Sequence, residues 1–214
     1  MKSFIRALGR EAESRAAALD TNRGGETATL YFGGGTPSML SDTHLGHLME
    51  TLDRLVPVDK LDEFSFEANP ATFTEKKVRF WRSLGMTRVS LGVQSLDSGI
   101  LHLLGREHTP AQALHSVEML KNAGMPHINM DLMFAIPGQT LSIWEATLKE
   151  AVRAGTDHIS AYNLTYEEDT EFFRSLLRGE KRQDPDEDAA FFELAEHMLE
   201  AAGLRHYETS NYPK

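Results

Sequence analysis

Three consecutive glycines follow a short β-type run, and they are the residues in this sequence best suited to approach a ligand. Gly33, Gly34 and Gly35 come directly after Ala28–Phe32 and lead into Thr36-Pro37-Ser38. Glycine lets backbone N–H groups come close to a ligand without a Cβ in the way, and three in a row weaken any strand or helix. The stretch therefore predicts a strand that opens onto a ligand, although a loop that only turns has the same composition.

Two familiar nucleotide-binding motifs do not match this loop. A Walker loop ends in Gly-Lys-Ser or Gly-Lys-Thr, and no lysine follows Gly35. A dinucleotide fingerprint has the spacing G-x-G-x-x-G and opens directly into a helix, whereas these glycines are contiguous and run into Thr36 and Pro37. The ligand is therefore not identified by either motif.

Three polar side chains, Glu67, Gln94 and Asp131, stand near the carboxyl ends of expected strands. These strands are predicted at residues 63–68, 88–94 and 127–134. Apolar residues alternate with polar or small ones in each strand, so helices must cover one face while the polar faces converge on the other. This pattern favours an open or partial barrel around a polar ligand. Buried polar groups that satisfy one another are the alternative for each residue taken alone.

Amphipathic helices alternate with the strands along the chain. Helices are predicted at 3–19, 75–84, 97–104, 110–123, 143–154 and 189–202, with further strands at 158–164 and 207–210. Another helix is predicted after an N-cap region at Ser41-Asp42, with an apolar face over 45–55. This rhythm is typical of βαβ units, and it predicts an α/β fold with a parallel sheet.

The overall composition narrows the class of protein. The 214 residues carry 22 basic and 32 acidic side chains, and the net charge of −10 argues against a broad nucleic-acid or anionic-membrane surface. No apolar run reaches the roughly 18 to 20 residues of a membrane span, and no secretory segment stands at the start, so we expect a cytoplasmic protein. His44 and His47 are predicted to lie on a solvated helix face, so we expect no metal site there.

Cysteine is absent from the chain. Disulfides, zinc–thiolate sites, cysteine nucleophiles and any cluster held by this chain's own thiolates are thereby excluded.

Five ordered motifs add a more specific signal. They are Tyr31-Phe32-Gly33-Gly34-Gly35-Thr36-Pro37-Ser38, Glu67-Ala68-Asn69-Pro70, Arg88-Val89-Ser90-Leu91-Gly92-Val93-Gln94-Ser95, Leu104-Gly105-Arg106-Glu107-His108, and Asn129-Met130-Asp131-Leu132-Met133 with Ile136-Pro137-Gly138. Together they resemble the oxygen-independent coproporphyrinogen III oxidase family of radical S-adenosylmethionine (SAM) proteins. The final stretch 207–212 is more similar to the haem chaperone branch than to the decarboxylating oxidases.

The resemblance implies a partial TIM-type (β/α) barrel that holds SAM and a [4Fe-4S] cluster. By motif position the cofactor-binding residues would be Gly34, Gly35, Thr36, Glu67, Gln94, Arg106 and Asp131. The glycine loop with its threonine would line the methionine part of SAM, Glu67 would reach a ribose hydroxyl and Arg106 a carboxylate, and Gln94 and Asp131 would complete the pocket. Backbone amides, a carboxylate and a guanidinium suit these roles.

The sequence departs from the family at the cluster. The family's ligands form a Cys-x-x-x-Cys-x-x-Cys loop upstream of a helix like 3–19, and no such loop is present. We therefore expect residues 1–214 to form a single partial barrel domain that lacks the first strand, the cluster loop and the C-terminal domain. Such a chain alone should not assemble the cluster or carry out radical chemistry. Truncation and a cysteine-free relative both remain open.

Three hypotheses for the function follow from the resemblance. The first is a haem chaperone-like protein whose complete form binds SAM, the cluster and haem, and transfers haem to haem-accepting proteins. The second is a coproporphyrinogen III dehydrogenase, which oxidatively decarboxylates its substrate in porphyrin biosynthesis. The third is a non-catalytic module that binds SAM or a nucleoside. All three imply small-molecule ligands and no nucleic acid.

Overall fold

The structure, a computed structural model, describes residues 1–16, 28–165, 168, 174, 178 and 184–214. The chain divides into two compact units, one of residues 1–90 with 118–127 and the other of residues 91–117 with 128–214.

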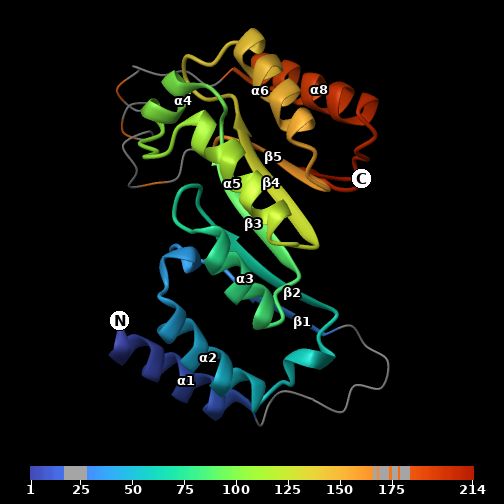
Figure 1. Cartoon of the computed structure of the whole chain (residues 1–214). Helices are drawn as coiled ribbons and strands as arrows, with labels where there is room; N and C mark the ends of the chain where they lie inside the picture. Colours follow the sequence, from blue (N-terminus) through green and yellow to red (C-terminus); the bar gives the residue numbers. More distant parts are fainter. Residues whose placement is uncertain (17–27, 166–167, 169–173, 175–177, 179–183) are drawn as a thin grey trace. The chain divides into compact units, whose positions relative to one another are not determined.

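The first unit combines two strands with a layer of helices (Figure 1). Its elements are α1 (Lys2–Ala16), β1 (Thr29–Phe32), the short helix η1 (Pro37–Met39), α2 (Asp42–Asp53), the short helix η2 (Val58–Lys60), β2 (Glu63–Ala68) and α3 (Glu75–Ser83). Ser41 and Thr74 begin α2 and α3, because each side-chain oxygen accepts a hydrogen bond from the N–H three residues later. Helix α1 ends at Ala16, and the last three residues of the helix expected at 3–19 lie outside the described residues.

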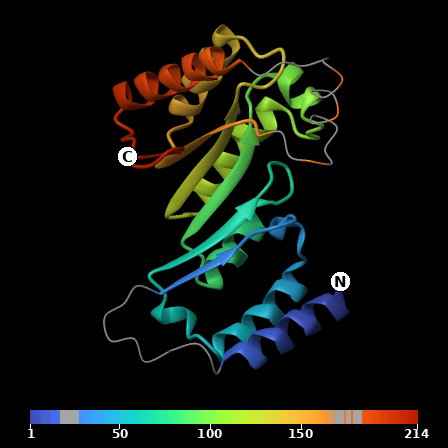
Figure 2. The ribbon, with the colours of Figure 1, turned by 180° about the vertical axis from the view of Figure 1, so that it is seen from behind.

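Strands β1 and β2 run parallel, with Tyr31 opposite Ser65 and Phe32 opposite Phe66. Phe32 and Phe66 point to the side of α3, where Phe66 packs on Trp81 with ring centroids 4.8 Å apart. Helix α3 covers that face of the two strands in Figure 1, and Figure 2 shows their opposite face from behind. Tyr31 lies on this opposite face, and 60% of it is exposed.

The second unit contains the later strands and helices. Its elements are α4 (Ser98–Leu103), α6 (Leu141–Ala154), β5 (His158–Asn163), α8 (Pro185–Ala201) and β6 (Asn211–Pro213). Strand β3 (Arg88–Gln94), helix α5 (Pro110–Asn122) and strand β4 (His127–Phe134) each have residues in both units. Helices α6 and α8 lie side by side, and Trp144 Nε1 donates to the Phe191 carbonyl at 3.0 Å.

The strand order in the sheet follows the chain from β1 to β6. Strands β4 and β5 are parallel, whereas β6 runs antiparallel to β5. The predicted α/β fold with a mainly parallel sheet is therefore confirmed, and the strands predicted at 63–68, 88–94 and 127–134 have the expected bounds.

Two predicted elements near the C-terminus were misplaced. The last strand is Asn211–Pro213 instead of 207–210, and Glu208 forms only an isolated bridge with Asn211. Helix α8 begins at Pro185, four residues before the predicted start at 189. Asp184 accepts hydrogen bonds from two N–H groups of the first turn, and the acidic residues that follow favour a helix N-terminus.

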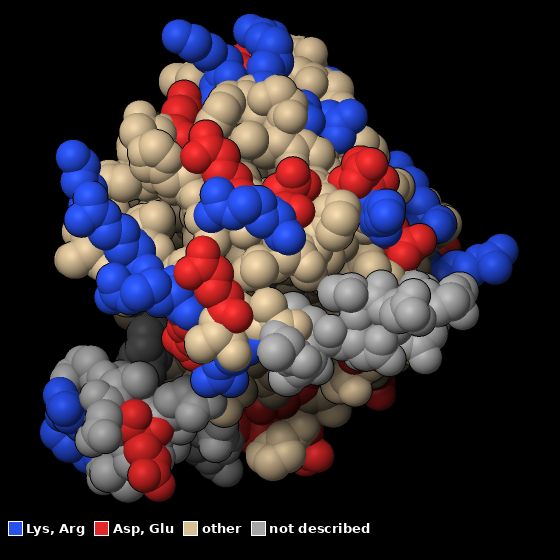
Figure 3. Space-filling view, turned by 90° about the horizontal axis from the view of Figure 1, so that it is seen from below, with Lys and Arg blue, Asp and Glu red and all other residues tan. Residues whose placement is uncertain are grey.

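Charges of both signs are interspersed on the face shown in Figure 3, and the described residues visible there form no broad basic surface. Within the described part of the chain, no helix is long and apolar enough to cross a membrane.

Candidate ligand-binding site

The glycine loop directly follows β1 and has open space beside it. Gly34 has φ of 78° and Gly35 has φ of 60°, which is the left-handed region that glycine adopts without strain. A Cβ built at either position meets no atom within 4 Å. The loop therefore requires glycine for its backbone conformation and has open space where side chains would stand.

Glu67 lies at the carboxyl end of β2 and is hydrogen bonded to this loop. Its Oε2 accepts the backbone N–H of Gly34 at 3.0 Å, and its Oε1 accepts the hydroxyl of Tyr31. The structure thus brings together two residues that the motifs singled out. It also adds Tyr31, which the sequence reasoning did not assign to the site, although strand alternation places Tyr31 and Glu67 on one face.

Hydrogen bonds from the loop after β2 hold the segment 36–38, which follows the three glycines. Asn69 donates its side-chain amide to Thr36 Oγ1 at 3.3 Å and its backbone N–H to Ser38 Oγ at 3.2 Å. The hydroxyls of Ser38 and Thr72 lie 2.6 Å apart, and Ser38 is fully buried. Asn69 therefore holds both Thr36 and Ser38, which belong to the segment that follows the glycines.

Lys77 adds a charged contact from α3. Its Nζ donates to the Ser38 carbonyl at 2.6 Å and lies 6.0 Å from the centre of the Trp81 ring. Burial lowers the pKa of Lys77, and the charge of Asp42 opposes this shift. The sequence contained no signal for this contact, because it joins residues 39 positions apart.

In the second unit, Gln94 and Arg106 lie near the end of β3. Gln94 has φ of 65°, a conformation that is uncommon for residues other than glycine and is found at functional sites. Arg106 Nη2 donates to the Gly92 carbonyl at 2.9 Å. Burial lowers the pKa of Arg106, and the negative charge of Asp131 opposes this shift. Arg106 and Asp131 are therefore electrostatically coupled.

A buried polar network holds Asp131. Asn129 donates its side-chain amide to Asp131 Oδ1 at 2.7 Å and to Ser160 Oγ at 2.9 Å. Ser160 donates to Asn211 Oδ1 at 2.6 Å, and His158 Nδ1 lies 2.7 Å from Asn129 Oδ1. An amide oxygen only accepts, so the proton of this last hydrogen bond is assigned to His158 Nδ1. Asp131 is thus held by Asn129 in the second half of β4, which ends at Phe134.

Two titratable groups near these residues have shifted pKa values. Burial lowers the pKa of His108, the nearby charge of Arg106 lowers it further, and the hydrogen bond to the Val93 carbonyl at 3.1 Å opposes both effects. Burial raises the pKa of Tyr162, and the Asp131 charge raises it further, whereas a hydrogen bond with Ser160 lowers it.

The predicted site residues thus form two sets. Gly34, Gly35, Thr36 and Glu67 belong to the first unit, and Gln94, Arg106 and Asp131 belong to the second. A hydrogen bond joins Gly34 and Glu67, and the negative charge of Asp131 opposes the lowering of the Arg106 pKa by burial.

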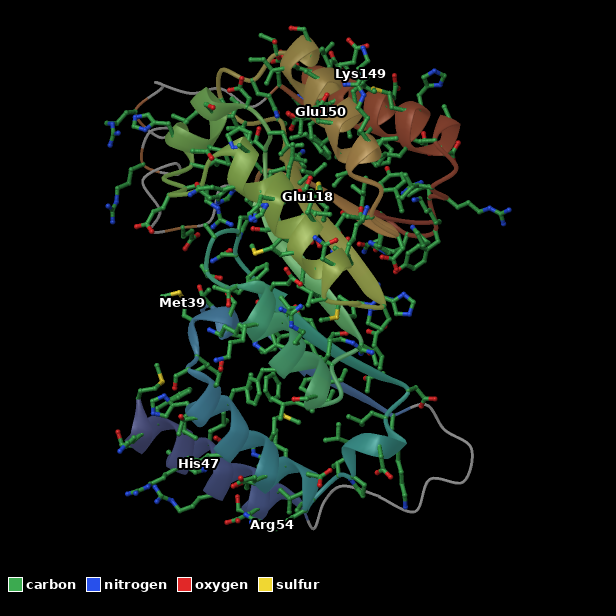
Figure 4. The ribbon with its side chains drawn as sticks, in the orientation of Figure 1. Met39, His47, Arg54, Glu118, Lys149 and Glu150 are labelled. Carbon is green, nitrogen blue, oxygen red and sulfur yellow. The ribbon has the colours of Figure 1, made fainter. Side chains whose placement is uncertain are left out.

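Histidines His44 and His47 lie elsewhere, along a groove of about 510 Å³ between α1 and α2 that Arg54 also lines (Figure 4). His44 Nδ1 is 2.9 Å from the Ser41 hydroxyl, and His47 pairs weakly with Glu50. Among the described residues, no group of three or more histidine, aspartate and glutamate side chains could hold a metal ion.

Comparison with known proteins gives consistent results. The model of the radical SAM superfamily matches residues 9–151. The chain is 35% identical over 188 residues to the heme chaperone HemW of Bacillus subtilis, covering 87% of this chain and 50% of the relative. It is 37% identical over 211 residues to HemW of Mycobacterium tuberculosis H37Rv, covering 98% of this chain and 53% of the relative. The chain therefore spans about half the length of these curated relatives.

A solved structure shares the fold. The coproporphyrinogen III oxidase HemN of Escherichia coli, a radical SAM enzyme, superimposes with a TM-score of 0.86 at 22% identity. The superposition covers 100% of this chain and 48% of HemN. This likeness concerns the fold, and it agrees with the expected partial barrel.

Radical SAM proteins use SAM and a [4Fe-4S] cluster, and the residues of this chain fit only the first. The open space beside Gly34 and Gly35, next to the Glu67 carboxylate, offers backbone polar groups and a carboxylate acceptor to a polar ligand. A cluster requires thiolates, and the 214 residues contain no cysteine. The match over residues 9–151 and the identity with the two HemW proteins show that the chain belongs to the radical SAM superfamily.

Proposed function

We propose that this chain is the SAM-binding part of a haem chaperone-like protein of the radical SAM superfamily. The observation that carries the proposal is the pairing of Gly34 N–H with Glu67 beside a glycine backbone that has free space around it. The relatives at 35% and 37% identity are named heme chaperones, whereas the likeness to the oxidase HemN, at 22% identity, is one of fold. The chaperone is therefore favoured over coproporphyrinogen III dehydrogenase.

Each site residue then has a role that its chemistry supports. Gly34 and Gly35 line the methionine part of SAM together with Thr36, with the Gly34 N–H donated to Glu67, and Glu67 accepts hydrogen bonds from ribose hydroxyls. In the second unit, Arg106 binds a carboxylate in the manner of a guanidinium fork. Gln94 and Asp131 are proposed as further SAM contacts, with the orientation of Asp131 fixed through its hydrogen bond from the Asn129 amide.

The metal centre is not part of this proposal for the chain itself. Bound SAM serves radical chemistry in superfamily members that also hold a [4Fe-4S] cluster, and these 214 residues offer the cluster no thiolate. Binding of haem and its transfer to acceptor proteins are proposed for the complete protein, on the strength of the HemW relatives. The cytoplasmic location stays a prediction from the sequence.

Calorimetric titration of the chain with SAM tests the proposal. We expect a measurable Kd, and Glu67→Ala should weaken binding at least about tenfold, because a charged hydrogen-bonding group is removed. Glu63→Ala is the matched control, since Glu63 lies on the same strand but pairs with Arg88 at 2.7 Å. Absence of SAM binding by the unmutated chain would contradict the proposal.

Haem function is tested on the complete protein. Stoichiometric transfer of haem to an acceptor without decarboxylation of coproporphyrinogen III is the expected result. Decarboxylation without haem transfer would favour the dehydrogenase instead. SAM binding with neither activity would favour the non-catalytic module.

A further inference from the structure

Tyr31 is an exposed aromatic residue on the face of β1 that also carries the ligand-site carboxylate. It is paired in register with Ser65, and Glu67 follows two residues later on the same face of β2. Its neighbour Phe32 points to the opposite face and packs against Phe64 and Phe66. Phe32 thus provides the apolar packing of this part of β1, whereas Tyr31, 60% exposed, lies on the face of the ligand-site carboxylate.

The phenol of Tyr31 and the amide of Gly34 hold the two oxygens of one carboxylate. Tyr31 donates to Oε1 of Glu67, and Gly34 N–H donates to Oε2 at 3.0 Å. A carboxylate has about four lone-pair sites, so each oxygen keeps one acceptor site after these bonds. Because both oxygens are held, the plane of the Glu67 carboxylate is set before a ligand binds.

Gly33 is part of the same arrangement for a steric reason. A Cβ at this position would collide with Cε1 of Tyr31 and would lie 3.0 Å from Oε1 of Glu67. The ring of Tyr31 therefore lies directly against the Gly33 backbone. Absence of a side chain at position 33 lets the phenol reach Glu67.

We propose that Tyr31 is a positioning residue that orients Glu67 toward the two vicinal hydroxyls of a ribose. This inference rests on the proposed function, in which Glu67 accepts hydrogen bonds from the ribose of SAM. The remaining acceptor site on each carboxylate oxygen matches one hydroxyl of the diol. A preorganised carboxylate loses less rotational freedom on binding, which raises affinity for ligands that carry the diol.

A chemical double-mutant cycle on the full chain tests this role. Tyr31→Phe keeps the ring and removes only the hydroxyl, and calorimetry measures its affinity for SAM and for the 2′,3′-dideoxy analogue of SAM. We expect a roughly three- to tenfold loss for SAM, the size typical of ordering one free side chain on binding. The affinity for the dideoxy analogue should change less than about twofold, since the coupled hydroxyls are absent.

Two further variants complete the design. Tyr31→Phe in a Glu67→Ala background should cause no additional loss of SAM affinity, because its effect acts through Glu67. Tyr207→Phe is the matched control, as Tyr207 is 65% exposed and lies in the other unit. Circular dichroism melting curves of each variant confirm that the fold is intact.

The outcomes separate this inference from the proposed function. If the unmutated chain binds no SAM, the proposed function fails and the role of Tyr31 fails with it. If the unmutated chain binds SAM but Tyr31→Phe weakens both ligands equally, or neither, only the positioning role is overturned. Selective loss for the diol-bearing ligand supports it.

Discussion

An alanine methyl group at position 33 would occupy the space that the ring of Tyr31 fills. Because Tyr31 is 60% exposed, its ring can turn into solvent, so the substitution removes the Tyr31–Glu67 hydrogen bond without straining the backbone. A hydrogen bond to a charged group contributes about 1.5 kcal/mol or somewhat more. Glycine to alanine at a compatible backbone position returns about 0.4–1 kcal/mol through the unfolded state. The net destabilisation by Gly33→Ala should therefore be about 0.5–1.5 kcal/mol.

Removing Tyr31 should reverse the sign of this effect. In a Tyr31→Ala background no ring opposes the new methyl group, and the Glu67 carboxylate, released from Tyr31, can shift away from the Cβ that would lie 3.0 Å from it. Gly33→Ala should therefore stabilise the chain by about 0.4–1 kcal/mol. Gly34→Ala serves as the contrast, since its φ of 78° is unfavourable for alanine although no atom lies within 4 Å. It should cost about 1–2 kcal/mol whether or not Tyr31 is present.

Urea unfolding followed by circular dichroism measures these free energies in the single and double variants. Equal destabilisation by Gly33→Ala with and without Tyr31 would refute the reasoning. A cost of Gly34→Ala that disappears with Tyr31 would refute it as well, because backbone strain does not depend on a neighbouring ring.

Other predictions concern groups outside the glycine loop. Burial raises the pKa of Tyr212 to about 12, and its hydroxyl has no hydrogen-bond partner among the described residues. Tyr212→Phe should therefore be neutral or stabilising, and in urea unfolding it should reduce the loss of stability between pH 10 and 12. Burial lowers the pKa of His108 below 6.5, so stability should fall as the pH drops through 6.5 toward the folded-state pKa, and His108→Gln should flatten this dependence in the same assay. Lys77→Met removes the 2.6 Å contact with the Ser38 carbonyl and should cost about 1.5–3 kcal/mol in urea, whereas the exposed neighbour Lys76→Met should have little effect.

Local pattern was sufficient for most of the strands. Alternation of apolar and polar residues, bounded by Asn-Pro or glycine, placed β2, β3 and β4 with their observed bounds. Strand β6 was misplaced because its position depends on antiparallel pairing with β5, in which Tyr212 faces Ile159. That pairing joins residues far apart in sequence, and no local signal specifies it.

The candidate site likewise contains residues that local motifs identified and residues that only tertiary contacts identified. Glycine spacing and motif order are enough to single out Gly34 and Glu67, and the hydrogen bond between them agrees with that selection. Tyr31, although part of the first motif, and Lys77 were given no role in the site, because their contacts join residues 36 and 39 positions apart. Only the parallel register of β1 and β2, and the packing of α3, bring these side chains to the loop.

The sequence by itself determined the α/β class, the superfamily resemblance and the lack of thiolate ligands, because residue types and local periodicity carry that information. The tertiary structure decided how each predicted residue is held. The hydrogen bonds to Glu67 from Tyr31 and Gly34 depend on the parallel register of β1 and β2. The Asn129 amide that bonds Asp131 within β4 also donates to Ser160 of the neighbouring strand β5. These are properties of the packed chain, since a shift of one residue in the register of β1 and β2 would place Tyr31 and Glu67 on opposite faces of the sheet.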